Sequence, residues 1–284
     1  MRSSDGTGIA WRADGPADAP AVVLCNGIAC DDGYWSRVWP QLAADHRVVR
    51  WHYRGHGRSD PPANREEVYV SSIVRDLEAV AAAADVERAV LVGHSFGVQV
   101  VAEAFRARRD LVAGLVAVAG AFGHPLGTLR GRDPGVLLFP LLELATWPAP
   151  RALTGVLRAG LRSPLAYWIG RAIGGIGSDA PRETMEEYFE HVAGLDPQVL
   201  LPMFRAMQAH SSEDVLPGID VPTVVLSGAD DGMTPPRRAA RMARAIPGAE
   251  LIELPRATHV LPIEEPDEVV DAVRRVVARA ERSA

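Results

Sequence analysis

Residues 90–97 read Val90-Leu91-Val92-Gly93-His94-Ser95-Phe96-Gly97. The apolar run before Gly93 is typical of a buried strand, and the apolar residues that follow recur at helical spacing, at Val98, Val101, Ala102 and Phe105. A strand therefore runs into a helix through the pattern Gly-x-Ser-x-Gly. In that setting the serine occupies a sharp turn that needs small flanking residues, and its hydroxyl projects from the top of the sheet at a helix N-terminus. Ser95 is thus a candidate nucleophile.

Short apolar runs rich in Val and Leu recur on both sides of this segment, and each is typical of a buried strand. They span residues 21–25, 48–51, 89–92, 111–118, 223–226 and 251–254. Segments with helical spacing lie between several of them, for example Ile73, Val74, Leu77, Val80, Ala81 and Ala84. This alternation predicts an α/β fold, a mostly parallel sheet with helices on both faces.

Residues 123–212 interrupt the alternation, because they contain helical patterns and many Pro and Gly residues but no convincing strand. We predict a helical insertion there, between two parts of a core domain at residues 1–122 and 213–284. Its apolar residues are numerous enough to line a pocket, although packing against the sheet explains any one of them at least as well. The set comprises Leu137–Leu144, Trp147, Leu153–Leu161, Tyr167, Trp168, Met185, Phe189, Met203, Phe204 and Met207.

Composition excludes several classes of partner and location. The 284 residues are 48% hydrophobic and 23% charged, close to the averages of soluble globular proteins. The formal net charge is −6 and no basic run is present, so we expect no nucleic-acid partner. The apolar runs are shorter than the ~18 residues of a membrane span, and the first residues do not read as a secretory signal. We expect a soluble, cytoplasmic protein, and the oligomeric state stays open.

The cysteines and histidines show no cofactor or metal pattern. Two cysteines, Cys25 and Cys30, are too few for a disulfide framework or a structural zinc site, and a buried, inert pair is the simpler interpretation. The eight histidines include no His-Glu-x-x-His pattern. His94, directly before Ser95, is better interpreted as a structural residue than as a second base. We therefore predict no cofactor and no metal.

A serine hydroxyl needs a base to remove its proton, and a histidine base needs a carboxylate to orient it and stabilise its charge. Two carboxylates, Asp230 and Asp231, follow the predicted strand at 223–226. His259 follows the predicted strand at 251–254. Parallel sheets place their ligands at the carboxyl ends of the strands, so these loops can meet Ser95.

With these features the chain resembles the α/β-hydrolase superfamily, specifically its serine-nucleophile, esterase-like members with a helical cap. The resemblance covers about residues 8–120 and 222–284. Gly93–Gly97 resembles the nucleophile elbow of that family. Residues 53–59, Tyr-Arg-Gly-His-Gly-Arg-Ser, resemble the arginine- and glycine-rich loop after its fourth strand.

Two further motifs resemble the loops of the family that carry the acid and the histidine. In the acid loop the carboxylate usually stands three residues after a glycine and four before a proline, and this spacing in residues 228–235 selects Asp231 over Asp230. The histidine loop usually has a glutamate five residues after the histidine, as Glu264 follows His259 here. The resemblance implies a catalytic set of Ser95, Asp231 and His259.

The resemblance also implies an oxyanion hole made by the backbone N–H groups of Ile28 and Phe96. The loop that would supply Ile28 departs from the family, because Asn26 stands where histidine is usual. His52 stands where the family often has aspartate, and Thr258 where it often has glycine. We expect Asn26 to alter the support of its loop more than the hole itself, and neither His52 nor Thr258 belongs to the catalytic set.

The function that the resemblance implies is a cofactor-independent serine hydrolase that cleaves carboxylic esters or lactones of small, fairly apolar molecules. A serine nucleophile disfavours epoxide hydrolase and haloalkane dehalogenase activity, because those relatives use aspartate. Carbon–carbon bond hydrolases, acyltransferases and perhydrolases use the same three residues. We rank ester cleavage first and carbon–carbon bond hydrolysis second. A small-molecule receptor with slow turnover is the alternative from another class.

Overall fold

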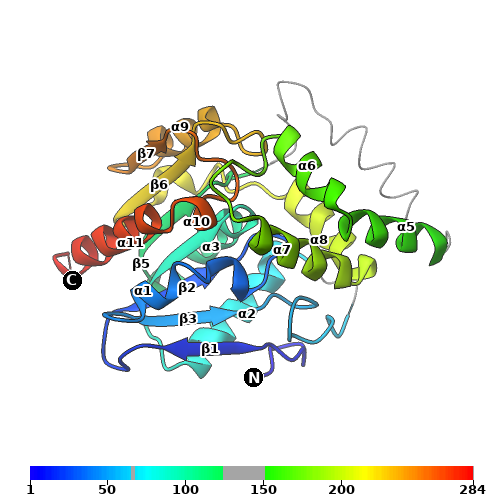
Figure 1. The fold of residues 1–284 in the computed structure, drawn as a ribbon. Helices are drawn as coiled ribbons and strands as arrows, with labels where there is room; N and C mark the ends of the chain where they lie inside the picture. Colours follow the sequence, from blue (N-terminus) through cyan, green and yellow to red (C-terminus); the bar gives the residue numbers. More distant parts are fainter. Residues whose placement is uncertain (65–67, 124–150, 284) are drawn as a thin grey trace.

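The computed structural model describes residues 1–64, 68–123 and 151–283, which form one seven-stranded sheet with helices around it (Figure 1). The strand order is β1-β3-β2-β4-β5-β6-β7. Strands β2 to β7 pair in parallel, and β1 pairs antiparallel with β3 at one edge. The strands are β1 (Trp11–Asp14), β2 (Ala21–Cys25), β3 (Arg47–Trp51), β4 (Ala89–His94), β5 (Val112–Val118), β6 (Thr223–Gly228) and β7 (Glu250–Leu254). This architecture confirms the predicted α/β class.

The apolar runs of the sequence correspond to β2 through β7, whereas β1 was not predicted. β1 reads Trp-Arg-Ala-Asp, and none of its four residues is fully buried. An edge strand held by backbone pairing needs no apolar run, so periodicity carries no signal for it.

Alternate residues of the central strands face two separate apolar clusters, one on each face of the sheet. On β2, Val23 and Cys25 belong to the first cluster, whereas Val22 and Leu24 belong to the second. Helices α2 (Val70–Ala83), α3 (Phe96–Ala107) and α9 (Pro236–Ala245) contribute to the first cluster. Helices α1 (Trp39–Leu42), α10 (Leu261–Glu264) and α11 (Pro266–Glu281) contribute to the second. Burial on both faces explains why these strands read as continuous apolar runs.

Helices α5 to α8 lie together at one end of the sheet (Figure 1). Their bounds are α5 (Arg151–Leu161), α6 (Pro164–Ala172), α7 (Arg182–Gly194) and α8 (Pro197–Ala209). They fall within the predicted insertion at 123–212, which we call the cap. The ends of the cap meet, because Gly123 forms a β-bridge with Ser211. The predicted apolar residues Leu137–Leu144 and Trp147 lie outside the described residues.

Short 3-10 helices complete the described elements: η1 (Asp32–Trp35), η2 (Arg109–Leu111) and η4 (Leu216–Gly218).

A third apolar cluster joins the cap to the core, and it includes Tyr167 and Met185 of the cap with Tyr34 and Ile263 of the core. Among the helices in the described ranges, none combines the length and the apolar character that crossing a membrane requires.

Candidate active site

Ser95 occupies the turn between β4 and α3 in a backbone conformation that side chains rarely adopt, with φ of +53° and ψ of −113°. The flanking glycines allow this turn because backbone atoms approach them closely. A Cβ at Gly93 would lie 2.4 Å from the carbonyl oxygen of Gly97, and a Cβ at Gly97 would lie 2.3 Å from that of Cys25. The turn places Ser95 at the N-terminal end of α3, where the helix dipole favours negative charge.

The structure brings Ser95, His259 and Asp231 together, although they follow different strands. Nε2 of His259 lies 2.9 Å from Oγ of Ser95, and Nδ1 of His259 lies 3.1 Å from Oδ2 of Asp231. His259 is 7% exposed and Asp231 is 3% exposed. The competing carboxylate, Asp230, is exposed and does not contact His259. Hydrogen bonds thus run in one line from a buried carboxylate through an imidazole to a serine hydroxyl.

Three donors orient the Asp231 carboxylate. Oδ1 accepts hydrogen bonds from the backbone N–H groups of Met233 and Thr234, at 2.8 and 2.7 Å. Oδ2 accepts one from the Thr234 hydroxyl at 2.6 Å. The sequence analysis missed Thr234, because its only signal was its place in the acid loop beside Pro235.

His94 has the contacts of a structural residue. Its Nε2 lies 2.9 Å from the backbone oxygen of His259, so Nε2–H donates to that carbonyl. Its ring stacks on Tyr34 with the centroids 4.6 Å apart. Burial lowers the pKa of His94 to about 3, so the imidazole is neutral. His94 therefore holds the backbone of His259.

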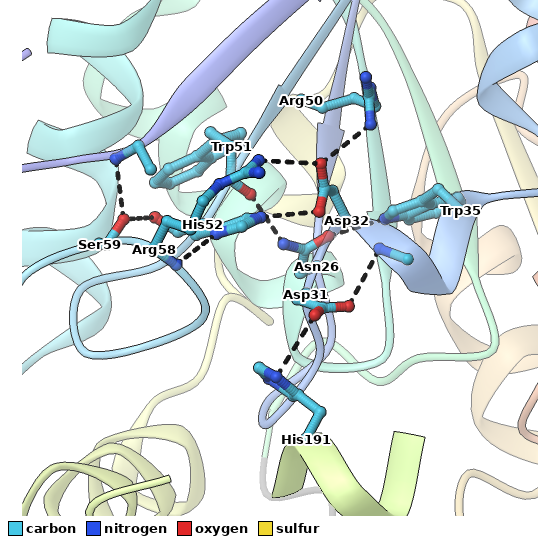
Figure 2. Close-up of polar contacts among 12 residues, drawn as sticks. Asn26, Asp31, Asp32, Trp35, Arg50, Trp51, His52, Arg58, Ser59 and His191 are labelled. Carbon is cyan, nitrogen blue, oxygen red and sulfur yellow. Dashed lines mark hydrogen bonds and ion pairs between the residues drawn. The ribbon is translucent and has the colours of Figure 1, made fainter. Parts of the chain in front are cut away.

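Asn26 supports the loop that leads to Ile28 (Figure 2). Its Oδ1 accepts a hydrogen bond of 2.8 Å from Nε1–H of Trp35, and its Nδ2–H donates one of 2.8 Å to the backbone oxygen of Trp51. The backbone oxygen of Asn26 accepts one of 2.7 Å from the Tyr53 hydroxyl. The Asn26 side chain is therefore a hydrogen-bonded anchor inside the core.

The backbone N–H groups of Ile28 and Phe96, which were predicted to form the oxyanion hole, have no hydrogen-bond acceptor in the part of the chain that the structure describes. The next residue, Ala29, has a φ of +60°. Its N–H donates to Nε2 of His56 at 3.2 Å, and burial lowers the pKa of His56 to about 4, which keeps that nitrogen an acceptor. The arginine- and glycine-rich loop thus holds the loop of Ile28 in place.

His52, which is buried, pairs with the partly exposed Asp32 (Figure 2). The N–H of Arg58 donates to Nδ1 of His52 at 2.8 Å, so Nε2–H of His52 donates to Oδ1 of Asp32, also at 2.8 Å. Arg50 donates to Oδ2 of Asp32 at 2.9 Å. The hydrogen bond from His52 and the charges of Arg50 and Arg58 lower the pKa of Asp32 to about 2. A carboxylate of η1 therefore pairs with the side chain at position 52.

The cap also contacts the core beside this pair. Nδ1 of His191, on α7, lies 3.3 Å from Oδ2 of Asp31 (Figure 2). The other oxygen of Asp31 accepts a hydrogen bond of 3.0 Å from the N–H of Gly33 at the start of η1. This contact places α7 next to the loop that carries Ile28.

A pocket of about 270 Å³ lies between the cap and the core, with Ser95 and His259 in its wall. Four of the predicted apolar residues of the cap line it: Met185, Phe189, Phe204 and Met207. Trp168 does not, because it is 57% exposed on the outer surface of α6. No Asp, Glu or Arg lies among the described residues of the wall. The pocket therefore suits an uncharged, apolar group.

Cys30 lies in the pocket wall and Cys25 is buried on β2, and both are free thiols. Burial raises the pKa of Cys25 to about 12 and that of Cys30 further, so neither forms a thiolate at neutral pH. Within the described ranges, no group of His, Cys, Asp and Glu is arranged to hold a metal ion.

Comparisons with known proteins agree with this architecture. Residues 20–266 match the family described as alpha/beta hydrolase fold. A Rhizobium rhizogenes protein named "Putative carbamate hydrolase RutD" is 26% identical over 271 residues, which cover 93% of this chain and 95% of that protein. The crystal structure of a hydrolase from Pseudomonas aeruginosa PA01 is 25% identical, with a TM-score of 0.79 and coverage of 98% and 97% of the two chains. That of the esterase RhEst1 from Rhodococcus sp. ECU1013 is 26% identical, with a TM-score of 0.75 and the same coverage. This chain is therefore a hydrolase that belongs to the α/β-hydrolase fold family.

Proposed function

We propose that this protein hydrolyses carboxylic esters of small, uncharged and apolar molecules, with Ser95 as nucleophile, His259 as base and Asp231 as the acid that orients His259. One observation carries the proposal. The hydrogen bonds from Asp231 through His259 to Ser95 end at a strained serine in the wall of an apolar pocket. Nucleophilic catalysis by serine requires this order of groups within hydrogen-bond reach.

The geometry supports an acyl-enzyme mechanism in two steps. Oγ of Ser95 attacks the ester carbonyl while Nε2 of His259 takes its proton, and the N–H groups of Ile28 and Phe96 bind the developing oxyanion. His259 then gives the proton to the leaving alcohol. In the second step His259 removes a proton from water, which attacks the acyl carbon. The bond from that carbon to Oγ of Ser95 then breaks, the acid is released, and His259 returns the proton to Oγ. Asp231 accepts from Nδ1–H of His259 throughout and stabilises the imidazolium.

The lining of the pocket favours an ester over a primary carbamate. Most of the described wall is hydrocarbon, from side chains such as Ile173, Phe189 and Phe204. The amino group of a carbamate would lose hydrogen bonds to water on entering this wall, whereas an alkyl or aryl ester has no such donors to desolvate. The name of the Rhizobium rhizogenes relative nevertheless makes a carbamate the substrate to compare directly.

The test compares hydrolysis of p-nitrophenyl esters of increasing acyl length by the wild type and by Ser95→Ala. We expect turnover of short and medium chains, reduced on the order of 10⁴-fold or more in the variant. Ser36→Ala, which changes an exposed serine, is the matched control and should retain activity. A lactone and a primary carbamate measured in parallel rank the substrate classes.

The other reactions of the same three residues give distinct results in this assay. Transfer of the acyl group to an added alcohol in preference to water would indicate an acyltransferase. Transfer of the acyl group to added hydrogen peroxide would indicate a perhydrolase. Inactivity on every ester together with cleavage of a diketone would indicate carbon–carbon bond hydrolysis. Tight binding of an ester without turnover would indicate a receptor.

A further inference from the structure

Glu264 is a buried carboxylate that takes no part in the proposed mechanism. It ends α10 and is only 8% exposed. Its Oε2 accepts a hydrogen bond of 2.7 Å from the N–H of Thr258. Its Oε1 accepts two, from the Thr258 hydroxyl at 2.8 Å and from the N–H of Gly177 at 2.7 Å. One carboxylate therefore joins the residue before His259 to a residue of the cap.

The cap segment at residues 174–177 lies between α6 and α7 and contacts both loops of the candidate site. At one end, the oxygen of Gly174 accepts a hydrogen bond of 3.0 Å from the N–H of Gly232, the residue after Asp231. At the other end, Gly177 packs so closely on Glu264 that a Cβ there would lie 2.3 Å from Oε1. The segment thus spans from the acid loop to the histidine loop.

The backbone of His259 is held on both sides. Its own carbonyl accepts from Nε2–H of His94 at 2.9 Å, and the preceding N–H, of Thr258, donates to Glu264. These two contacts hold the backbone from which the imidazole extends toward Oγ of Ser95. A change in the contact between Glu264 and the cap is therefore transmitted to Nε2 of His259 through one residue.

We propose that Glu264 is a positioning residue that couples the cap segment 174–177 to His259, so that His259 aligns with Ser95 only while the cap is seated. This inference rests on the proposed function, because it assigns a consequence to the alignment of those two residues.

The chemistry requires a carboxylate rather than an amide at position 264. Each of its oxygens accepts one backbone N–H, Oε1 from Gly177 and Oε2 from Thr258. Glutamine has the same shape, but its NH₂ group cannot accept a hydrogen bond. Whichever way the amide turns, one of the two backbone donors faces another donor, so the coupling breaks with little change in volume.

The experiment compares the wild type, Glu264→Gln and the control Glu253→Gln, which changes an exposed glutamate on β7. The first readout is the rate at which a p-nitrophenyl alkylphosphonate labels Ser95, followed by the mass of the adduct and the released nitrophenol. The second is the low-field proton resonance of Nδ1–H of His259, which requires no turnover. Ester kcat and KM are measured on the same preparations.

We expect Glu264→Gln to be labelled at least tenfold more slowly than the wild type, to lose kcat by a similar factor with KM within twofold, and to shift or broaden the His259 resonance. Glu253→Gln should match the wild type in every readout. Gly177→Ala, which displaces the cap segment and leaves Glu264 intact, should act in the same direction, and it decides the question if Glu264→Gln does not fold.

The proposal is overturned if the His259 resonance and the labelling rate of the folded Glu264→Gln or Gly177→Ala protein match those of Glu253→Gln. Failure of the proposed function looks different, because the wild-type serine would then not be labelled at all. In that case the His259 resonance alone decides whether Glu264 positions the histidine.

Discussion

The Thr234 hydroxyl donates a hydrogen bond of 2.6 Å to Oδ2 of Asp231. This is the oxygen that lies 3.1 Å from Nδ1 of His259, and the hydroxyl oxygen itself lies 3.3 Å from the same nitrogen. The Thr234 hydroxyl and Nδ1–H of His259 therefore both donate to Oδ2 of Asp231. The hydroxyl fixes the rotation of the carboxylate, so that Oδ2 faces the imidazole.

Replacement of Thr234 by valine should test this role, because valine keeps the shape and removes the hydroxyl. We expect kcat to fall about tenfold, the equivalent of one hydrogen bond to a charged group, with KM little changed. Thr234→Ser keeps the donor and should retain most of the activity. Equal kcat in the serine and valine variants would show that the hydroxyl does not contribute.

The two neighbouring aspartates should differ sharply. Asp231→Asn removes the acceptor of Nδ1–H and should lower kcat by about 10³–10⁴-fold, because the imidazole loses its orienting charge. Asp230→Asn changes an exposed side chain and should stay within twofold of the wild type, on the order of ordinary surface substitutions. Steady-state ester hydrolysis measures both, and a large loss in Asp230→Asn alone would reverse the assignment.

Asn26→Ala should lower stability rather than act on catalysis directly. It leaves the indole N–H of Trp35 and the backbone oxygen of Trp51 without partners inside the core. Each buried group left unsatisfied costs about 1–3 kcal/mol. Urea denaturation gives the free energy of unfolding, and Ser36→Ala, at an exposed site, should change it by less than about 0.5 kcal/mol. If Asn26→Ala lowered the free energy of unfolding by no more than the control variant does, the anchoring role would be excluded.

Acid should destabilise the protein through its buried histidines. The pKa of His94 is lowered to about 3 and that of His56 to about 4, from 6.5 in the unfolded chain. Between these values the unfolded state binds protons that the native state does not, so the free energy of unfolding is fully retained above pH 6.5 and falls as pH decreases toward 4. Each histidine contributes a slope of up to about 1.4 kcal/mol per pH unit.

His56→Gln isolates one of these histidines. The amide oxygen of glutamine can still accept from the N–H of Ala29, and the side chain no longer titrates. Urea titrations between pH 7 and 4 give the free energy of unfolding at each pH. The slope of this free energy against pH should be smaller than in the wild type by the equivalent of about one proton. An unchanged slope would mean that His56 is not the group that protonates on unfolding.

Local patterns in the chain were sufficient for the α/β class, for β2 to β7 and for Ser95 at a strand-to-helix turn, because burial on both faces imposes apolar runs and a tight turn imposes glycine. The edge strand β1 was missed, since backbone pairing leaves no apolar run. The cap helices were expected from helical spacing, but that spacing does not show which apolar side chains face the pocket. Phe204 lines it whereas Trp168 is exposed.

Only the tertiary structure decided which groups meet across loops that are distant in sequence. Ser95 and His259 are 164 residues apart, and their contact depends on the parallel strands ending at one edge of the sheet. The partners of Thr234 and Glu264 could not be read from the chain either, because a hydroxyl or a carboxylate has no periodicity and its role follows from the donors and acceptors that the fold places within about 3 Å of it. The sequence thus determines the buried strands and their order, and packing determines the hydrogen bonds between the loops that join them.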